Sequence, residues 1–164
     1  MLAYIGLGSN LDEPLNQVRS ALDELAALPQ SHCLAQSSLY RSPPMGPQDQ
    51  PDYINAVALL ETTLEPLALL AQLQRIEAQH HRQRGLERWG PRTLDLDLLL
   101  YDDTEMTTPT LTVPHPGLYE RNFVLYPLME IVAARESDLA IPGRGMLSEL
   151  MAKCDRDGLE RLDH

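Results

Sequence analysis

The chain has 164 residues and a formal net charge of -11, with 24 acidic and 13 basic side chains. This balance excludes nonspecific nucleic-acid binding and attraction to an anionic membrane, because both need a broad basic surface. The length predicts a single domain over residues 1–164 that buries a hydrophobic core. Neither a signal peptide nor an apolar stretch of membrane-spanning length is recognisable, and Cys33 and Cys154 form no disulfide framework. We therefore expect a cytoplasmic protein.

The first half of the chain alternates between strand and helix patterns. An apolar run over residues 2–8 predicts a strand, and apolar residues at helical spacing between Pro14 and Pro29 predict a helix. Residues 33–41 alternate loosely and predict a second strand. The proline-rich stretch 42–47 is a stiff loop, and residues 53–62, apolar and partly β-branched, predict a third strand.

The second half begins with an amphipathic helix after Pro66, followed by an arginine-rich window and a strand from Asp95. Residues 107–116 are irregular, with at most one short edge strand, and residues 122–133 and 146–154 predict helices. We expect the last ten residues to be loosely held. The order strand, helix, strand, strand, helix, strand indicates an α+β, ferredoxin-like βαββαβ core: an antiparallel sheet with helices packed on it and extra C-terminal helices. A doubly wound parallel fold fits less well, because no helix separates the second and third strands.

Two aspartates stand two positions apart on the strand after residue 93. Successive strand side chains alternate between faces, so Asp95 and Asp97 should share one face. The opposite face should carry the leucines Leu94, Leu96, Leu98 and Leu100. Neighbouring like charges on an apolar strand are costly unless a cation neutralises them, and oxygen ligands suit Mg²⁺. The alternative is a solvated sheet face with exposed acids.

Basic residues gather directly before this pair. Arginines bind phosphates with planar, bidentate donors, so arginines beside two carboxylates are typical of a site for a magnesium-bound polyphosphate. A run of arginines at a helix end can also be a solvated terminus, and only the adjacency of the two groups favours the site. The window contains Arg82, Arg84, Arg88 and Arg92.

Three further groups are candidates for ligand contacts. Tyr53 and Asn55 share a strand face beside the proline-rich loop, where a ring and an amide can stack on and hydrogen-bond a heteroaromatic ligand. The remaining candidates lie on one side of the second helix and in the irregular segment; they are Gln74, Glu77, Thr112, His115, Arg121 and Phe123. The run from Gly6 to Leu11 lacks the third glycine of a dinucleotide motif and the lysine of a P-loop, and predicts a strand-to-helix turn.

Four segments together resemble the 6-hydroxymethyl-7,8-dihydropterin pyrophosphokinase family of folate biosynthesis, over residues 4–133. The segments, in this order, are Leu39-Tyr40-Arg41-Ser42-Pro43-Pro44, Asp52-Tyr53-Ile54-Asn55-Ala56, Arg88-Trp89-Gly90-Pro91-Arg92-Thr93-Leu94-Asp95-Leu96-Asp97 and Val113-Pro114-His115. The resemblance implies a ferredoxin-like fold and transfer of the β,γ-pyrophosphoryl group of ATP to the hydroxymethyl oxygen of the pterin, releasing AMP.

The resemblance also implies roles for individual residues. Asp95 and Asp97 bind two Mg²⁺ ions that clamp ATP, and the catalytic residues are Arg82, Arg92 and Asp97. Contacts with ATP are expected from Gln74, Glu77, Arg84, Trp89, Arg92, Leu98, Thr112, His115 and Arg121. Contacts with the pterin are expected from Ser42, Pro43, Pro44, Met45, Gly46, Tyr53, Asn55, Trp89 and Phe123.

The partners expected from the resemblance are the two small-molecule substrates, with no nucleic acid, no membrane and a monomeric chain. The acceptor of the hydroxyl proton stays open between a metal-acidified hydroxyl and Asp97. A noncatalytic nucleotide-binding module is the main rival. It needs no second, aromatic-lined pocket, which Tyr53, Asn55 and Phe123 would provide here.

Overall fold

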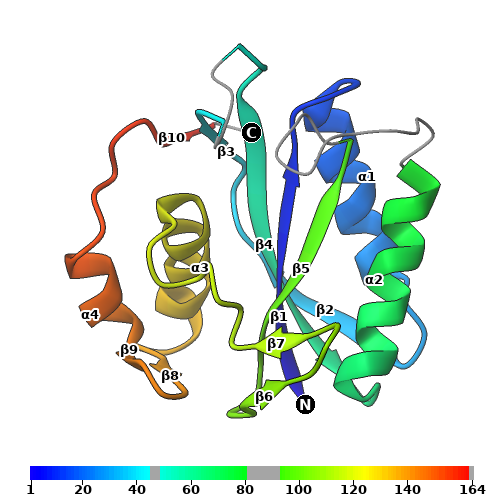
Figure 1. Ribbon diagram of the computed structural model, residues 1–164, viewed down its shortest axis with the longest axis vertical. Coiled ribbons are helices and arrows are strands. Elements are labelled where there is room, and N and C mark those ends of the chain that lie inside the picture. Colours follow the sequence, from blue (N-terminus) through cyan, green and yellow to red (C-terminus); the bar gives the residue numbers. More distant parts are fainter. Residues whose placement is uncertain (45–48, 81–92, 163–164) are drawn as a thin grey trace.

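An antiparallel sheet forms the centre of the molecule (Figure 1). The computed structural model describes residues 1–44, 49–80 and 93–162. Within them, the strands are β1 (Leu2–Ser9), β2 (Ser31–Gln36), β3 (Tyr40–Ser42), β4 (Tyr53–Thr62), β5 (Asp95–Tyr101), β6 (Met106–Thr107), β7 (Thr112–Val113), β8 (Ala140–Ile141), β9 (Gly145–Met146) and β10 (Glu160–Arg161). The helices are α1 (Pro14–Ala26), α2 (Pro66–His80), α3 (Asn122–Arg135) and α4 (Leu147–Ala152).

The strand order of the main sheet is β10-β3-β4-β1-β5, and β2 also pairs with β4. Both β1 and β2 run antiparallel to β4, so they are parallel to each other with β4 between them. In the same way, β4 and β5 both run antiparallel to β1, so they are parallel to each other with β1 between them. Each of these parallel pairs is joined through a helix, α1 or α2, which gives two split βαβ units. The ferredoxin-like α+β prediction is therefore confirmed.

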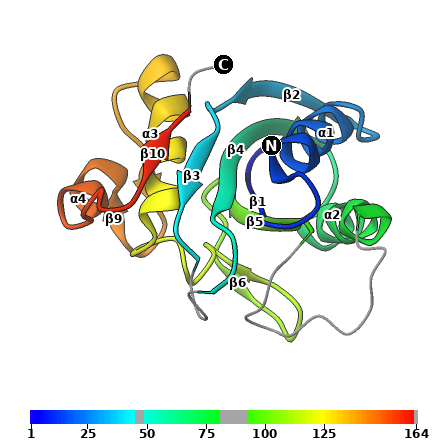
Figure 2. The ribbon, with the colours of Figure 1, turned by 90° about the horizontal axis from the view of Figure 1, so that it is seen from above.

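Helices cover both faces of the sheet (Figure 2). On one face, the inward residues Ala3, Ile5 and Leu7 of β1 belong to a core cluster with α1 and α2. On the other face, Tyr4 and Val57 belong to a second cluster with α3, against which α4 packs. Each fully buried leucine in these layers contributes about 1.5–3 kcal/mol by leaving water. None of the helices in the described part of the chain combines the length and apolar character needed to cross a membrane.

A bulge interrupts β5 after the two aspartates. Ile5 pairs with Leu98 and Tyr4 pairs with Leu100, so Leu99 is an extra residue in the ladder. As a result Leu99 and Leu100 both pack on the α3 side, and Tyr101 packs with α1 and α2. The prediction that Leu100 shares a face with Leu94, Leu96 and Leu98 is wrong, because a bulge shifts the alternation of faces by one residue.

Three other segments differ from the sequence-based expectation. The strand expected over residues 33–41 is broken into β2 and β3, which pair with opposite ends of β4. The last residues were expected to be loosely held, but Glu160 and Arg161 form β10 on the edge of β3. The backbone N–H of Leu162 also donates to the carbonyl of Leu39, at 2.8 Å. The predicted helix 146–154 is shorter, because Met146 pairs with Ala140 in a small hairpin.

Candidate active site

A cavity of about 130 Å³ opens on the α3 side of the sheet. It lies where β1 ends, where β4 and β5 begin, and beside the first turn of α3. It is lined by Gly6, Leu7, Gly8, Ser42, Pro43, Tyr53, Asn55, Ala56, Asp95, Asp97, Leu99, His115, Arg121, Phe123 and Val124.

Two glycines of the central strand form the floor of this cavity. Gly6 pairs with Asp97, and Gly8 pairs with Asp95 on one side and with Asn55 on the other. A Cβ on Gly8 would lie 3.3 Å from Asn55 Oδ1, and a Cβ on Gly6 would lie 3.3 Å from a side-chain carbon of Leu99. The missing side chains hollow the sheet at this point.

These glycines were missed from the sequence as site residues. Both fell at the end of the strand expected over residues 2–8, and the run from Gly6 to Leu11 was interpreted as a strand-to-helix turn without a ligand role. The strand β1 continues to Ser9, so both glycines lie inside it. A glycine in a strand interior often marks a close approach by a ligand or another backbone, and this signal could have identified Gly6 and Gly8.

The acidic part of the cavity is formed by Asp95 and Asp97, which line it from the same face of β5 as expected. The side chain of Asp97 is 47% exposed, and its Oδ1 lies 3.7 Å from Nε2 of His115. The bulge contributes directly to this arrangement, because the carbonyl of Leu99 accepts the backbone N–H of His115 at 2.9 Å. A bulge next to a site commonly re-aims a side chain in this way.

The ring of His115 is held in one orientation. Its Nδ1 accepts the backbone N–H of Gly117 at 3.0 Å, so the neutral ring carries its proton on Nε2, toward Asp97. Burial lowers the pKa of His115, Asp97 opposes this effect, and Arg121 lowers the pKa further. The neutral imidazole is therefore a hydrogen-bond donor directed at the acidic part of the cavity.

Arg121 supplies the positive charge among the described lining residues. Its guanidinium carbon lies 5.9 Å from the centroid of the Phe123 ring. It also packs on Gly117, where an added Cβ would come within 2.5 Å of that carbon. Gly117 thus leaves the space that Arg121 occupies.

The other part of the cavity is aromatic and amide-bearing. Tyr53 at the start of β4 and Phe123 at the start of α3 are both half-buried wall residues. In the same cavity, the amide nitrogen of Asn55 donates to the hydroxyl of Ser42 at 2.7 Å, and both side chains are buried. This bond assigns the amide nitrogen to Ser42, which leaves Oδ1 of Asn55 as an acceptor beside Gly8.

The donor set of the acidic part suits a hard cation. Two carboxylates on one strand face, one of them half exposed, supply oxygen ligands and leave most of a coordination shell to other oxygens. Mg²⁺ is commonly held by one or two carboxylates together with water and phosphate oxygens. Among the residues that the structure describes, no group of three or more His, Cys, Asp or Glu side chains could hold a metal alone. Asp95 and Asp97 therefore fit a metal that arrives with phosphates.

Among the described residues, the other predicted ones do not line the cavity. Pro44 is buried next to it, Gln74 is exposed on α2, and Thr112 lies in β7. Glu77 accepts the backbone N–H of Leu96 at 2.9 Å and so ties α2 to β5. The side chain of Leu98 is buried on the opposite face, and a contact with a nucleotide would have to use its backbone. Outside the described residues lie Met45, Gly46, Arg82, Arg84, Trp89 and Arg92.

Comparisons with known proteins agree with this geometry. The family model for 7,8-dihydro-6-hydroxymethylpterin-pyrophosphokinase (HPPK) matches residues 4–133. The 2-amino-4-hydroxy-6-hydroxymethyldihydropteridine pyrophosphokinase of Haemophilus influenzae is 50% identical over 149 residues, which cover 91% of this chain and 90% of that protein. The protein of the same name from Pseudomonas aeruginosa is 49% identical over 159 residues, which cover 97% of this chain and 95% of that protein.

A solved structure shares the fold. Plasmodium falciparum HPPK-DHPS, solved with SDX-DHP, matches with a TM-score of 0.68 at 12% identity, over 98% of this chain and 47% of that chain. This chain thus spans about half the length of that solved chain. From the family match and the two bacterial relatives, the chain belongs to the 7,8-dihydro-6-hydroxymethylpterin-pyrophosphokinase family.

Proposed function

We propose that this pyrophosphokinase transfers the β,γ-pyrophosphoryl group of ATP to the hydroxymethyl oxygen of 6-hydroxymethyl-7,8-dihydropterin. The products are AMP and the pterin pyrophosphate used in folate biosynthesis. The observation that carries the proposal is one cavity with two kinds of wall, aromatic and amide on one side and carboxylate, imidazole and guanidinium on the other. A flat heterocycle and a polyphosphate need these two kinds of wall next to each other.

The aromatic side is the proposed acceptor site. The rings of Tyr53 and Phe123 sandwich the pterin, since stacked aromatic rings attract beyond the area they bury. Asn55 is held by Ser42 with its Oδ1 available, so this oxygen accepts an N–H from the edge of the heterocycle. Pro43 contributes a rigid wall to the same pocket.

The acidic side is the proposed phosphate site. Asp95 and Asp97 would hold Mg²⁺, and the family resemblance implies that two ions are bound. The bound metal neutralises phosphate charge and orients the chain of phosphates. Two carboxylates without a cation would repel a polyphosphate, so activity should depend on Mg²⁺.

His115 and Arg121 complete the phosphate side. The Nε2–H of His115, fixed by Gly117, donates to a phosphate oxygen without adding a formal charge. Arg121, which packs on Gly117, offers a planar, charged donor set on the same side. Such preorganised donors stabilise the charge that develops during phosphoryl transfer.

Residues outside the described ranges keep their proposed roles from the family resemblance. Arg82 and Arg92 stabilise charge during transfer, and Arg84 and Trp89 contact ATP. We expect the chain to act as a monomer, as the family resemblance implies. Sedimentation velocity with and without substrates tests this expectation, and a dimer would contradict it.

Product analysis tests the proposed reaction. The protein is mixed with ATP, Mg²⁺ and 6-hydroxymethyl-7,8-dihydropterin, and nucleotides and pterins are separated by anion-exchange chromatography. We expect AMP and a pterin pyrophosphate in equal amounts, and neither product when the metal is chelated. ADP with a pterin monophosphate would contradict the proposed transfer, and tight ATP binding without turnover would favour a noncatalytic nucleotide-binding module.

A further inference from the structure

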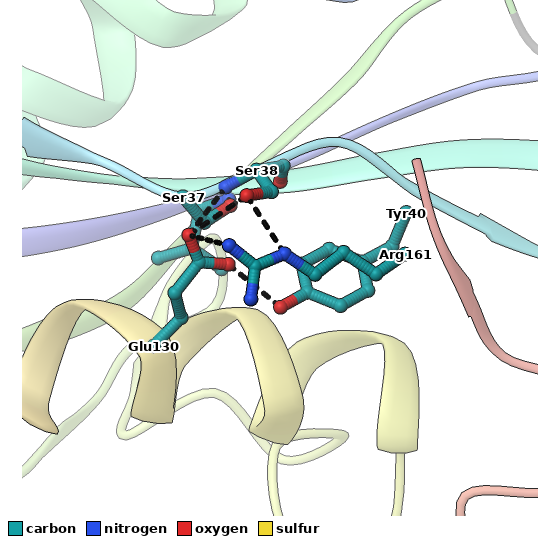
Figure 3. Close-up of polar contacts among 6 residues, drawn as sticks. Ser37, Ser38, Tyr40, Glu130 and Arg161 are labelled. Carbon is teal, nitrogen blue, oxygen red and sulfur yellow. Dashed lines mark hydrogen bonds and ion pairs between the residues drawn. The ribbon is translucent and has the colours of Figure 1, made fainter. Parts of the chain in front are cut away.

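A polar cluster outside the lining of the cavity connects α3 to the break between β2 and β3 (Figure 3). Glu130 of α3 accepts three hydrogen bonds: Ser38 donates its backbone N–H and its hydroxyl to Oε2, each at 2.9 Å, and Tyr40 donates its hydroxyl to Oε1 at 2.6 Å. Burial, and then Glu130, raise the pKa of Tyr40, so its phenol remains a neutral donor. Both oxygens of one half-buried carboxylate therefore hold β3 to α3.

The C-terminal segment completes the cluster. Arg161 pairs with Tyr40 in the sheet, and its guanidinium lies 3.5 Å from Oε2 of Glu130. Its Nε also donates to the hydroxyl of Ser38 at 3.1 Å. The charge of Glu130 is thus balanced by a residue that β10 brings to the edge of β3, as Figures 1 and 2 show for the two strands.

The cluster is connected to the cavity through β3. Ser42, the last residue of β3, and Pro43 both line the cavity. Gly158 of the C-terminal segment packs on the Pro43 ring, where an added Cβ would lie 3.1 Å from two ring carbons. Its φ of 77° is in the left-handed region that favours glycine. The C-terminal segment therefore supports the wall of the cavity from outside.

The cluster is also connected to the cavity through α3. Phe123 and Glu130 are seven residues apart, which is close to two helical turns, so both are on the same side of α3. Next to Phe123, the side-chain amide of Asn122 donates to the carbonyls of Asp155 and Asp157, each at 3.0 Å. The same C-terminal segment thus contacts the elements that carry both walls.

We propose that the cluster of Glu130, Ser38, Tyr40 and Arg161, together with residues 155–162, sets the separation between β3 and α3 and thereby positions the pterin pocket. Glu130 and Arg161 are positioning residues that touch neither substrate. The inference rests on the proposed function, because it assumes that the pocket between Ser42 and Phe123 holds the pterin. It predicts a larger effect on the acceptor than on ATP, since Asp95 and Asp97 belong to β5 and the carbonyl of Leu99 in β5 holds His115. Among the described phosphate-side residues, Arg121 is the one that adjoins α3.

The test compares four variants of the full chain by steady-state kinetics. Glu130→Gln removes the charge, and Arg161→Ala removes the C-terminal partner. Arg161→Lys keeps a positive charge near Glu130. The matched control is Glu160→Ala, which breaks the exposed ion pair with Arg41 (3.3 Å) on the same two strands without touching the cluster.

We expect Glu130→Gln and Arg161→Ala to raise the KM for the pterin by about fivefold or more, a typical size for coupling through a packed network. The KM for ATP should rise by a smaller factor, about twofold or less, because only Arg121 of the described phosphate-side residues adjoins α3. Arg161→Lys should recover most of the loss, and Glu160→Ala should behave as wild type for both substrates. Urea unfolding of each variant checks that the fold is retained.

Two results would overturn the inference. One is a pterin KM for Glu130→Gln and Arg161→Ala that equals that of Glu160→Ala. The other is an equal rise of the KM for pterin and for ATP, which indicates a change of the whole site and not of the pterin pocket. If Glu130→Gln fails to fold, the half-exposed Arg161 decides the question alone. If wild type shows no turnover, the proposed reaction fails, and calorimetric Kd values for the pterin test the positioning role separately.

Discussion

The substitution Gly117→Ala should displace Arg121 without removing any donor from the site. A Cβ at this position would lie 2.5 Å from Cζ, 2.6 Å from Nε and 2.8 Å from one terminal nitrogen of Arg121. No such contact is tolerated, so the guanidinium must rotate away. The far end of a flexible side chain moves at little cost, and alanine keeps the backbone N–H that holds His115. Stability and the orientation of His115 should therefore be retained.

The expected loss is in nucleotide affinity. A hydrogen bond to a charged group contributes about 1.5–3 kcal/mol, which corresponds to a loss of about 10-fold to 150-fold in affinity. Displacement of Arg121 should weaken binding of Mg-ATP by an amount in this range. The pterin affinity should change less, since the Asn55–Ser42 pair and Tyr53 are not touched.

The assay is isothermal titration of Mg-ATP into wild type, Gly117→Ala, Arg121→Ala and the double variant. If Gly117→Ala acts by displacing Arg121, the double variant should bind no worse than Arg121→Ala. Additive losses, or a Gly117→Ala protein that binds like wild type while Arg121→Ala does not, would refute the reasoning.

Three further substitutions address other parts of the account. Asp97→Ala should abolish product formation with little change in the urea midpoint, because the side chain is half exposed; wild-type turnover would remove the metal assignment. Gly8→Ala places a methyl group 3.3 Å from Asn55 Oδ1 and should raise the KM for the pterin more than that for ATP; unchanged initial rates at low pterin would show that the cavity floor is not the acceptor site. Leu69→Ala, at a fully buried position of α2, should lower the free energy of unfolding in urea by about 2–5 kcal/mol, and a smaller loss would contradict the packing described.

Much of the fold could be read from periodicity. The strand expected over residues 53–62 has these bounds, and the shared face of Asp95 and Asp97 followed from the two-residue repeat of a strand. The order of elements was sufficient to predict the antiparallel sheet with its two split βαβ units. These features depend on patterns within one segment. Each pattern extends over enough residues that one residue that departs from it does not change the prediction.

The features that were missed depend on contacts between distant segments. The extra residue Leu99 is visible only in the pairing of β5 with β1, because neither strand alone shows a break in its pattern. Likewise, β10 is two residues long and polar, and the partners that hold it, among them Glu130 for Arg161, come from distant parts of the chain. No periodic signal can be read from so short a strand.

The candidate site was predicted from motifs, and the structure adds the reason for its shape. Tyr53, Asn55 and Asp97 were expected in the site and line one cavity. The hollow that brings them together comes from Gly6 and Gly8, whose contribution is the absence of side chains. Motifs of chemically active residues do not reveal such positions, whereas the pairing of β1 with both neighbours does.

The central claim is that pterin and metal-bound phosphates occupy two sides of one cavity. A crystal structure with a nonhydrolysable ATP analogue, Mn²⁺ in place of Mg²⁺ and 6-hydroxymethylpterin tests it most directly, because Mn²⁺ can be located by anomalous scattering. The account predicts anomalous density at Asp95 and Asp97 and the pterin ring between Tyr53 and Phe123. A pterin bound elsewhere, or metal density away from both aspartates, would contradict it.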